Sequence, residues 1–274
     1  MNSMVEKYHD GTINSGTSVI IGIRDRYDYR INNALASLRA QKPGRGLLEV
    51  LLVDYGSDRK YRGCFDALCA EYSVVGVWTG TANQWNRAHC MNIGIKFASQ
   101  EFVLFSDVDI IFDEMYVKNC MCIPQSSPGI AVYSDMLELG REHESQLLRS
   151  PLGIKRLKRF AVARACVRKN SLFPYGSSIL FVPRFPLVAM RGFDESFKLW
   201  GCEDVDLLQR LSLCGIQFAK LTESFHLHQW HERFENVKAN SGLRRQIDLN
   251  FDYLARQSSI VRNLESWGDP RFIR

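Results

Sequence analysis

The sequence predicts an α/β fold, with a sheet flanked by helices, from the alternation of two kinds of segment. In the first half of the 274-residue chain, short aliphatic runs alternate with stretches whose apolar residues repeat at helical spacing. Strands that alternate with helices imply parallel pairing through right-handed crossovers. No apolar run reaches the roughly 18 residues that a membrane-spanning helix needs, so none is expected.

The first half supplies the clearest elements. Its predicted strands are runs of aliphatic and aromatic residues, at residues 18–23, 48–53, 74–78 and 102–105. Its predicted helices are amphipathic stretches, at residues 31–38, at residues 65–72 and through Ala88, Met91, Ile95 and Ala98.

The second half changes character. It predicts strands at residues 129–133, 178–182 and 217–221, a helix over residues 203–214 and a polar helix over residues 236–264. No repeat or low-complexity linker divides the chain, so one continuous domain over residues 1–274 is predicted.

The net charge of +5 is concentrated in one basic segment. Residues 141–169 hold nine Lys or Arg against two Glu, and the remainder of the chain is slightly acidic. Such a segment favours an anionic partner, for example a charged glycan or an anionic lipid surface. A solvated helix face explains it equally well. We expect no nucleic-acid partner.

The cysteines and the first residues of the chain indicate in which cellular compartment the protein is expected. The eight cysteines lack the spacing of a disulfide framework or of a zinc site. Residues 1–18 are polar and have the pattern of neither a signal peptide nor a membrane anchor. We therefore expect reduced thiols and a cytoplasmic protein, with at most peripheral contact at the inner face of the membrane.

The most informative motif is Ser106-Asp107-Val108-Asp109, directly after an apolar strand. Ligands of open α/β sheets bind beyond the carboxyl ends of the strands. Two carboxylates buried there without a partner carry a large free-energy penalty. A divalent cation removes the penalty, and oxygen ligands suit Mg²⁺ or Mn²⁺ bound to a diphosphate. A polar turn that caps the next helix is the alternative.

A second motif, Trp200-Gly201-Cys202-Glu203-Asp204, precedes a helical pattern. Acidic residues in the first turn of a helix are favourable for dipole reasons alone. The preceding Trp200-Gly201 indicates in addition a sugar pocket with an aromatic wall. A carboxylate at this place can act as the general base for an acceptor hydroxyl.

A third motif gathers three of the six histidines, His226, His228 and His231, in a predicted loop. Neutral imidazole binds transition-type divalent ions, although a lone histidine is more often structural. With Asp109 these histidines complete a mixed oxygen and nitrogen site, which favours Mn²⁺ over Mg²⁺.

In their order along the chain, these motifs resemble those of a known family. Residues 86–94 (NRAHCMNIG), 105–109 (FSDVD) and 200–204 (WGCED) follow the order seen in β-1,4-galactosyltransferases. Bacterial chondroitin-polymerase-type family 2 transferases and polypeptide N-acetylgalactosaminyltransferases are similar in the later motifs. The resemblance spans roughly residues 18–233. It implies the GT-A fold, a Rossmann-like mixed sheet that binds a nucleotide-sugar.

The resemblance also implies an organisation and a set of catalytic and metal-binding residues. Residues 1–110 would bind the nucleotide, residues 111–235 would bind the acceptor, and residues 236–274 would form a helical extension. Asp109 and His231 match metal ligands, and His228 lies where a second ligand or phosphate contact is expected. Asp204 matches the catalytic base, and Glu203 would hold hydroxyls of the sugar or acceptor.

For the UDP-sugar donor, the resemblance implies contacts beyond the first two strands. Gly22, Ile23 and Arg24 would hold the base and ribose. Asp54 would accept a hydrogen bond from the uracil N–H group.

Further donor contacts match positions along the rest of the chain. Arg87 would face the diphosphate, and Asp107 would support the nucleotide side of the metal. Gly176 lies beside the donor sugar, and Trp200 walls its pocket. The sequence departs from the usual WGGED motif at Cys202, which narrows the backbone freedom there.

The implied reaction is an inverting transfer of a hexose or N-acetylhexosamine to a hydroxyl of a glycan or lipid-linked saccharide, within polysaccharide biosynthesis. Two alternatives stay open: a retaining transferase, and a non-catalytic nucleotide- or glycan-binding module. The sequence lacks Gly-rich phosphate loops, which argues against nucleotidyltransferases, dehydrogenases and NTPases. We expect the basic segment, residues 141–169, to act as a mobile lid over an anionic acceptor.

Overall fold

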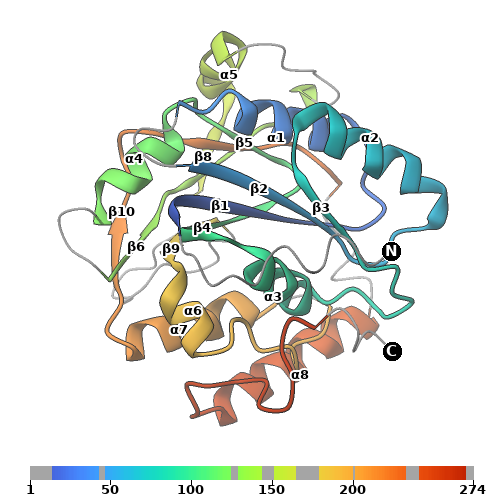
Figure 1. The fold of residues 1–274 in the computed structure, drawn as a ribbon, viewed down its shortest axis with the longest axis vertical. Helices are drawn as coiled ribbons and strands as arrows, with labels where there is room; N and C mark the ends of the chain where they lie inside the picture. The colour runs from blue at the N-terminus through green and yellow to red at the C-terminus, as the bar shows by residue number, and fades with distance from the viewer. Residues whose placement is uncertain are drawn as a thin grey trace.

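A seven-stranded sheet runs through the middle of the molecule, with helices on both faces (Figure 1). The computed structural model describes residues 14–42, 47–124, 129–143, 151–164, 179–199, 201–232 and 241–269. In spatial order, the strands of the sheet are β10 (Gln217–Lys220), β6 (Ile130–Tyr133), β9 (Leu180–Pro183), β4 (Gln100–Asp107), β1 (Asn14–Ile23), β2 (Leu47–Asp54) and β3 (Val75–Trp78).

The pairing within this sheet is mixed. β1 runs parallel to β2 and to β4, β2 runs parallel to β3, and β10 runs parallel to β6. β9 lies between β4 and β6 and is antiparallel to both. The first half of the chain thus forms the predicted parallel β-α units, and strands from the second half extend the same sheet.

A smaller sheet adjoins the end of β4. Its strands, in spatial order, are β5 (Ile110–Phe112), β11 (His226–His228), β7 (Met136–Glu138) and β8 (Val162–Arg164). The sequence did not predict this sheet, because strands of three residues are too short to display a period. The histidine motif, expected in a loop, begins on strand β11, and that expectation was wrong for His226 and His228.

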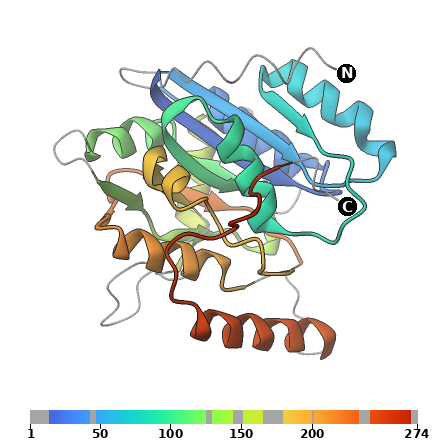
Figure 2. The same cartoon turned by 60° about the horizontal axis from the view of Figure 1, so that its bottom comes forward.

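Helices cover the two faces of the large sheet. The helices that the structure describes are α1 (Tyr29–Arg39), α2 (Arg62–Tyr72), α3 (Arg87–Phe97), α4 (Tyr116–Cys122), α5 (Pro151–Leu157), α6 (Arg184–Ala189), α7 (Glu203–Leu213) and α8 (Ser241–Arg256), with short 3₁₀ turns η2 (Arg59–Tyr61), η4 (Arg141–His143) and η5 (Lys158–Phe160). α1, α2 and α4 pack on one face, and α3, α6 and α7 pack on the other. Figure 2 shows α8 along the base of the molecule, beyond α6 and α7.

The hydrophobic core lies on both faces of the sheet because successive side chains of a strand point in opposite directions. Along β1, Val19 and Ile21 are fully buried against the α1 side, whereas Ile20 is fully buried against α3. Burying one such side chain contributes about 1.5–3 kcal/mol. β1 is therefore anchored from both faces, which fixes the position of its carboxyl end.

Within the described residues, the strands and helices predicted between residues 18 and 221 occur, with ends displaced by a few residues. The helix predicted over residues 236–264 was wrong in its second part, since α8 ends at Arg256. Beyond it the chain turns at Asn263 (φ 50°) and Gly268 (φ 57°), and Trp267 packs against the core. Residues 236–240 lie outside the described residues.

Among the helices that the structure describes, none has the length and apolarity needed to cross a membrane.

Candidate active site at the carboxyl ends of the strands

The register of the sheet brings the predicted strand-end residues together. Gly22 lies opposite Asp107 on β4, and Ile23 lies opposite Asp54 on β2. Three parallel strands therefore end at the same edge of the sheet, where ligands of open α/β sheets bind.

Asp109, His228 and His231 form a compact group, as the sequence predicted. One ligand atom from each lies within 4.8 Å of the others. Asp109 Oδ2 is 3.4 Å from His231 Nε2, and Asp109 Oδ1 is 3.7 Å from His228 Nε2. The smaller sheet explains this proximity, because β11 pairs antiparallel with β5 and sets His228 opposite Ile110, the residue after Asp109.

The group fits a divalent cation. Asp109 is 2% exposed, and its buried Oδ1 accepts no hydrogen bond from the described residues. A buried carboxylate oxygen without a hydrogen-bond donor is costly unless a cation meets it. His231 Nδ1 lies 3.1 Å from the Glu232 carbonyl oxygen; with its proton on Nδ1, the ring turns the Nε2 lone pair toward Asp109. One carboxylate and two imidazoles are ligands that divalent transition-metal ions bind.

Arg26, which the sequence did not single out, also reaches this group. Its Nη1 lies 3.4 Å from Asp109 Oδ2, and its side chain is 42% exposed. The only signal for it in the sequence is its place just after the first strand, where loop residues approach the ligand edge. The guanidinium brings positive charge to the carboxylate that we assign to the cation.

His226 has a different role from the other two histidines. It is fully buried, and its Nδ1 lies 2.9 Å from Ser134 Oγ. Burial, followed by the proximity of His228, lowers the pKa of His226 to about 3. We therefore interpret it as a neutral structural residue that packs between Phe112 and Tyr116.

Arg87 contacts Asp107 and shares two small hollows with Glu203 and Asp204, the acid pair at the start of α7. It lies in the first turn of α3, is buried, and donates from Nε and Nη2 to Asp107 Oδ1 at 3.2 Å. It lines one small hollow with Asp204 and an adjacent one with Glu203. Burial opposes the charge of Arg87, but Asp107, Glu203 and Asp204 outweigh it and raise the pKa of the guanidinium.

Glu203 and Asp204 open α7 and face a desolvated environment. Burial, then the charge of Asp204, raises the pKa of Glu203, and Arg87 acts in the opposite direction. Burial likewise raises the pKa of Asp204, and the positive charge of Arg87 acts in the opposite direction. Glu203 is buried, whereas Asp204 keeps partial exposure. A partly exposed carboxylate with a raised pKa is a stronger base than an ordinary carboxylate, which is the property that a proton acceptor needs.

The residues at the end of β1 act mainly through the backbone. A Cβ atom on Gly22 would approach Cys90 Sγ of α3 to 2.8 Å, so glycine allows the close packing of β1 on this helix. The side chain of Ile23 is buried in the core. Arg24 is half-buried, and its Nη1 donates to the Asn83 carbonyl oxygen at 2.6 Å.

Asp54 is fully buried and holds two loops together. Its Oδ2 accepts from the Tyr27 hydroxyl (2.5 Å), and its Oδ1 accepts from the Ser57 N–H group (2.9 Å). Tyr27 in turn stacks on Tyr61, with ring centroids 5.0 Å apart. The carboxylate thus organises the segments after β1 and β2, and its contact with a uracil stays a prediction.

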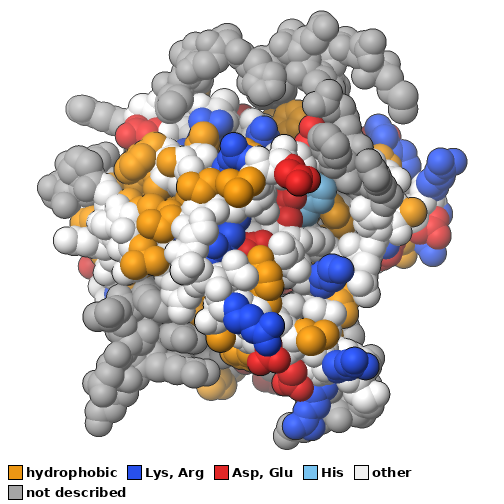
Figure 3. Space-filling model, turned by 90° about the horizontal axis from the view of Figure 1, so that it is seen from below, with side chains coloured by type: hydrophobic (Ala, Val, Ile, Leu, Met, Phe, Trp, Pro, Cys, Tyr) orange, Lys and Arg blue, Asp and Glu red, His pale blue; other side chains and the backbone are white. Residues whose placement is uncertain are grey.

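Two predicted site residues, Gly176 and Trp200, lie outside the described residues, as do parts of the basic segment, residues 141–169. The seven cysteines of the described part are free thiols. Seen from below, the surface has acidic side chains next to a histidine, so carboxylate and imidazole groups are accessible together on this face (Figure 3).

Comparison with known proteins places this geometry in a family. Over 146 residues the chain is 27% identical to chondroitin sulfate synthase 3 of Mus musculus. This match covers 51% of this chain and 15% of that protein. Over 258 residues it is 23% identical to polypeptide N-acetylgalactosaminyltransferase 8 of Drosophila melanogaster, covering 87% of this chain and 42% of that protein. The chain thus spans less than half the length of either relative.

A solved structure and a protein family that the chain matches also belong to the glycosyltransferases. GalNAc-T7, solved with UDP, GalNAc and Mn²⁺, superimposes with a TM-score of 0.62 at 14% identity, over 87% of this chain and 48% of that one. This likeness shows that the fold is GT-A. Residues 18–261, most of the sequence, match the family described as glycosyltransferase-like family 2. The chain therefore belongs to glycosyltransferase-like family 2.

Proposed function

We propose that the chain is a metal-dependent, inverting glycosyltransferase that moves a hexose or N-acetylhexosamine from a UDP-sugar to a hydroxyl of a glycan or glycolipid. The observation that carries the proposal is the buried Oδ1 of Asp109, without a hydrogen-bond donor among the described residues and beside His228 and His231. The UDP and Mn²⁺ bound by GalNAc-T7 support the same choice of ligands.

Asp109, His228 and His231 would hold the cation, Mn²⁺ or alternatively Mg²⁺. When bound, it supplies positive charge to the diphosphate of the donor. Arg87 adds a fixed positive charge from a buried position, where an electrostatic interaction is stronger than in water. Its bond to Asp107 keeps the guanidinium oriented before the donor arrives.

In the proposed reaction, Asp204 takes the proton of the acceptor hydroxyl. The hydroxyl oxygen forms a bond to the anomeric carbon as the bond from that carbon to the diphosphate oxygen breaks, and UDP leaves. Glu203, buried beside Asp204, would accept from hydroxyls of the sugar or acceptor. The configuration of the anomeric carbon would be inverted.

The donor base and ribose would lie at the ends of β1 and β2. Gly22, Ile23 and Arg24 contribute mainly backbone there, and Asp54 would accept from the uracil N–H group. Gly176 and Trp200 would line the sugar pocket. We propose that residues 1–110, 111–235 and 236–274 belong to one domain, which the sheet built from both halves supports.

Substitution of the proposed base tests the mechanism. Asp204→Asn should lower turnover by about 100-fold or more, because general base catalysis typically contributes that much. The affinity for UDP with Mn²⁺ should change little, since Asp204 is not among the proposed metal ligands. Glu101→Gln, an exposed acid on β4, is the matched control. Full activity in Asp204→Asn would show that another group takes the proton.

The donor can be identified by thermal shift with a panel of nucleotide-sugars and Mn²⁺. A ligand at 100 times its Kd stabilises the folded state by about 2.7 kcal/mol. Donor hydrolysis in the same mixtures separates an enzyme from a binding module, which would hydrolyse none. The anomeric configuration of the product, read by NMR, separates the inverting reaction from a retaining one.

The acceptor side is proposed from charge. The basic segment, residues 141–169, would close over an anionic glycan or a lipid phosphate, at a cytoplasmic site with at most peripheral membrane contact. Neutralising Lys155, Arg156, Lys158 and Arg159 should raise the acceptor KM and leave the donor KM unchanged. An unchanged acceptor KM would indicate that the segment is an ordinary solvated surface and does not bind the acceptor.

A further inference from the structure

The C-terminal segment packs on the loop that leads into the acid pair. We call residues 241–269, which comprise α8 and the chain after it, the strap, and the described residues 191–199 and 201–202 the acid loop. The acid loop connects α6 to α7 and ends directly before Glu203 and Asp204. In Figure 2 the strap runs below α7 and then along α3.

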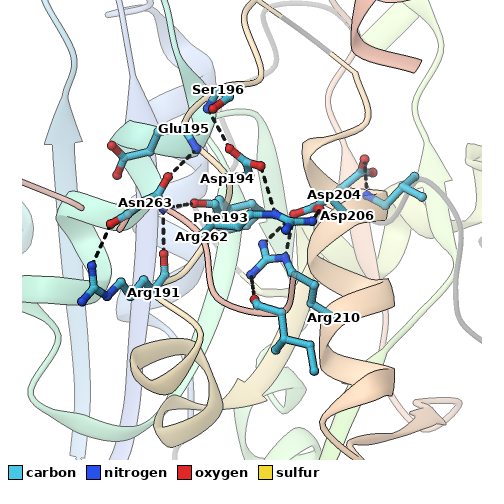
Figure 4. A network of polar contacts seen from close by, with 12 residues as sticks. Arg191, Phe193, Asp194, Glu195, Ser196, Asp204, Asp206, Arg210, Arg262 and Asn263 are labelled. Carbon is cyan, nitrogen blue, oxygen red and sulfur yellow. Dashed lines mark hydrogen bonds and ion pairs between the residues drawn. The ribbon is translucent and has the colours of Figure 1, made fainter. Parts of the chain in front are cut away.

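Arg262 of the strap links the two sides of the acid loop (Figure 4). Its Nε lies 3.1 Å from Asp194 Oδ2, and its Nη2 lies 2.9 Å from Asp206 Oδ1 in the first turn of α7. Arg210 completes the group by donating from Nε to Asp206 Oδ2 at 2.7 Å. All four side chains are at most 7% exposed, so two arginines balance two aspartates in the interior.

Two side chains of α8 bind the acid loop from below. Asn250 Nδ2 donates to the carbonyl oxygens of Lys198 (3.0 Å) and Gly201 (3.1 Å). The Tyr253 hydroxyl donates to Asp194 Oδ2 at 2.9 Å. Asn250 is buried although it lies on a helix whose other residues keep some exposure, so its two bonds to the acid loop form away from solvent.

The chain after α8 adds a third attachment, at Asn263. Its Nδ2 donates to the carbonyl oxygens of Arg191 (2.9 Å) and Phe193 (2.7 Å), and its Oδ1 accepts from the Glu195 N–H group (3.0 Å). Figure 4 shows these bonds beside the ion pairs of Arg262. Arg191 Nη1 in turn donates to the Asn263 carbonyl oxygen at 3.0 Å, so hydrogen bonds run in both directions between the acid loop and the strap.

The acid loop needs this support because its backbone is strained. Leu199 (φ 61°) and Cys202 (φ 75°) are non-glycine residues in the left-handed region. Such conformations persist only where the surroundings over-determine them. Asn250 binds the carbonyl groups directly before these two residues, at Lys198 and Gly201.

The loop is also tied to the helix that carries Arg87. Glu195 Oε1 accepts from Asn92 Nδ2 of α3 and from the Gly268 N–H group of the strap, both at 2.8 Å. The strap, the acid loop and α3 therefore form one bonded unit, which contains Arg87 and leads directly into the acid pair.

We propose that the strap is a clamp that positions Glu203 and Asp204 against Arg87, with Asn250 and Arg262 as positioning residues. The inference rests on the proposed function, because it gives the clamp a role in the transfer reaction. Neither residue contacts the donor in this proposal. Asn250 acts through backbone carbonyl groups of the acid loop, and Arg262 acts through the side chains of Asp194 and Asp206.

The test uses the full chain carrying Asn250→Asp or Arg262→Lys. Asn250→Asp replaces the donor to two carbonyl groups with an acceptor, and Arg262→Lys keeps the charge but replaces the two nitrogens that bind Asp194 and Asp206 with one. Hydrogen exchange at the amides of Ser196, Phe197 and Asp206 should accelerate by about 10-fold or more as the loop opens locally. Donor turnover should fall by about 10- to 100-fold through misplacement of the acids. The Kd for UDP with Mn²⁺ and the donor KM should stay within about twofold, because the clamp lies outside the donor contacts.

Two controls separate positioning from loss of stability. Asp248→Asn changes an exposed residue of α8 and should leave exchange and turnover unchanged. Leu38→Ala removes core volume from α1 and provides a matched decrease in Tm away from the loop. Unchanged loop exchange in Asn250→Asp, or turnover no lower than in Leu38→Ala at equal Tm, overturns the proposal. If the unaltered chain turns over no nucleotide-sugar, the proposed function fails, and hydrogen exchange alone decides whether the clamp exists.

Discussion

At the scale of single residues, the site is defined by Asp109. Its carboxylate is buried, yet Oδ1 accepts no hydrogen bond from the described residues. Natural proteins tolerate such destabilised groups where function requires them. In the proposed function the residue thus links two properties that can be measured separately, affinity for a cation and stability without one.

Asp109→Asn should therefore lower the affinity for the cation without lowering the stability of the metal-free chain. Without metal, the variant should be at least as stable as the parent, since it removes a buried charged oxygen that accepts no hydrogen bond from the described residues. With Mn²⁺, the parent chain should gain stability and the variant should not. Urea denaturation with and without Mn²⁺ measures both effects, and Glu101→Gln is the control. A variant that still responds to Mn²⁺ would show that the cation binds elsewhere.

At this scale the sequence predicted the candidate cation group but could not separate the histidines that belong to it from the one that does not. Asp109, His228 and His231 were correctly grouped, because a strand-end acid and clustered imidazoles share one chemistry. The same pattern included His226, whose burial beside Ser134 depends on packing that no local spacing reveals. Arg26 was missed because an arginine in a loop carries no distinguishing pattern.

At the scale of elements, α3 depends on its first residues. Asn86 caps the helix, because its Oδ1 accepts from the His89 N–H group at 2.9 Å. Its Nδ2 donates to the Glu195 carbonyl oxygen at 2.8 Å. One side chain therefore fixes both the start of the helix that carries Arg87 and the acid loop beside it.

Asn86→Ala should lower the free energy of unfolding by about 1–2 kcal/mol, the usual cost of losing a helix cap. Asn86→Asp should lose less, because a carboxylate still caps the helix but cannot donate to Glu195. Urea denaturation at fixed pH compares the two variants with the parent. Equal losses in both would mean that the bond to Glu195, and not the cap, carries the stability.

Elements were predictable where they were long or strongly patterned. β1, β2 and β4 have continuous buried runs, and α7 has regular apolar spacing. The strands β5 and β11 are three residues long and exist because they pair with each other, a long-range property. The end of α8 was missed because Trp267 and Asn263 form tertiary contacts that outweigh helix propensity.

At the scale of the whole molecule, the buried acid pair couples stability to pH. Glu203 keeps its proton to higher pH in the folded chain than its ordinary pKa of about 4.3 allows. The folded state then binds more protons than the unfolded state in the interval above that value. This contribution is fully present below the ordinary pKa and is lost as pH rises through the raised pKa.

Glu203→Gln, which resembles the protonated acid, should therefore match the parent in stability near the ordinary carboxyl pKa and exceed it at pH values above the raised one. Chemical denaturation over a pH series in metal-free buffer measures the difference, with Glu101→Gln as the control. A difference that shrinks as pH rises would mean that the folded chain favours the charged carboxylate.

The antiparallel strand β9 has a consequence for the order in which the chain becomes structured. It fills the place beside β4, so the edge of β4 stays open until residues 180–183 have been made. An open hydrophobic strand edge invites pairing with other chains during synthesis. The stretch between Asp107 and Leu180 must therefore be made before that edge is covered, and until then the edge is open to pairing with other chains.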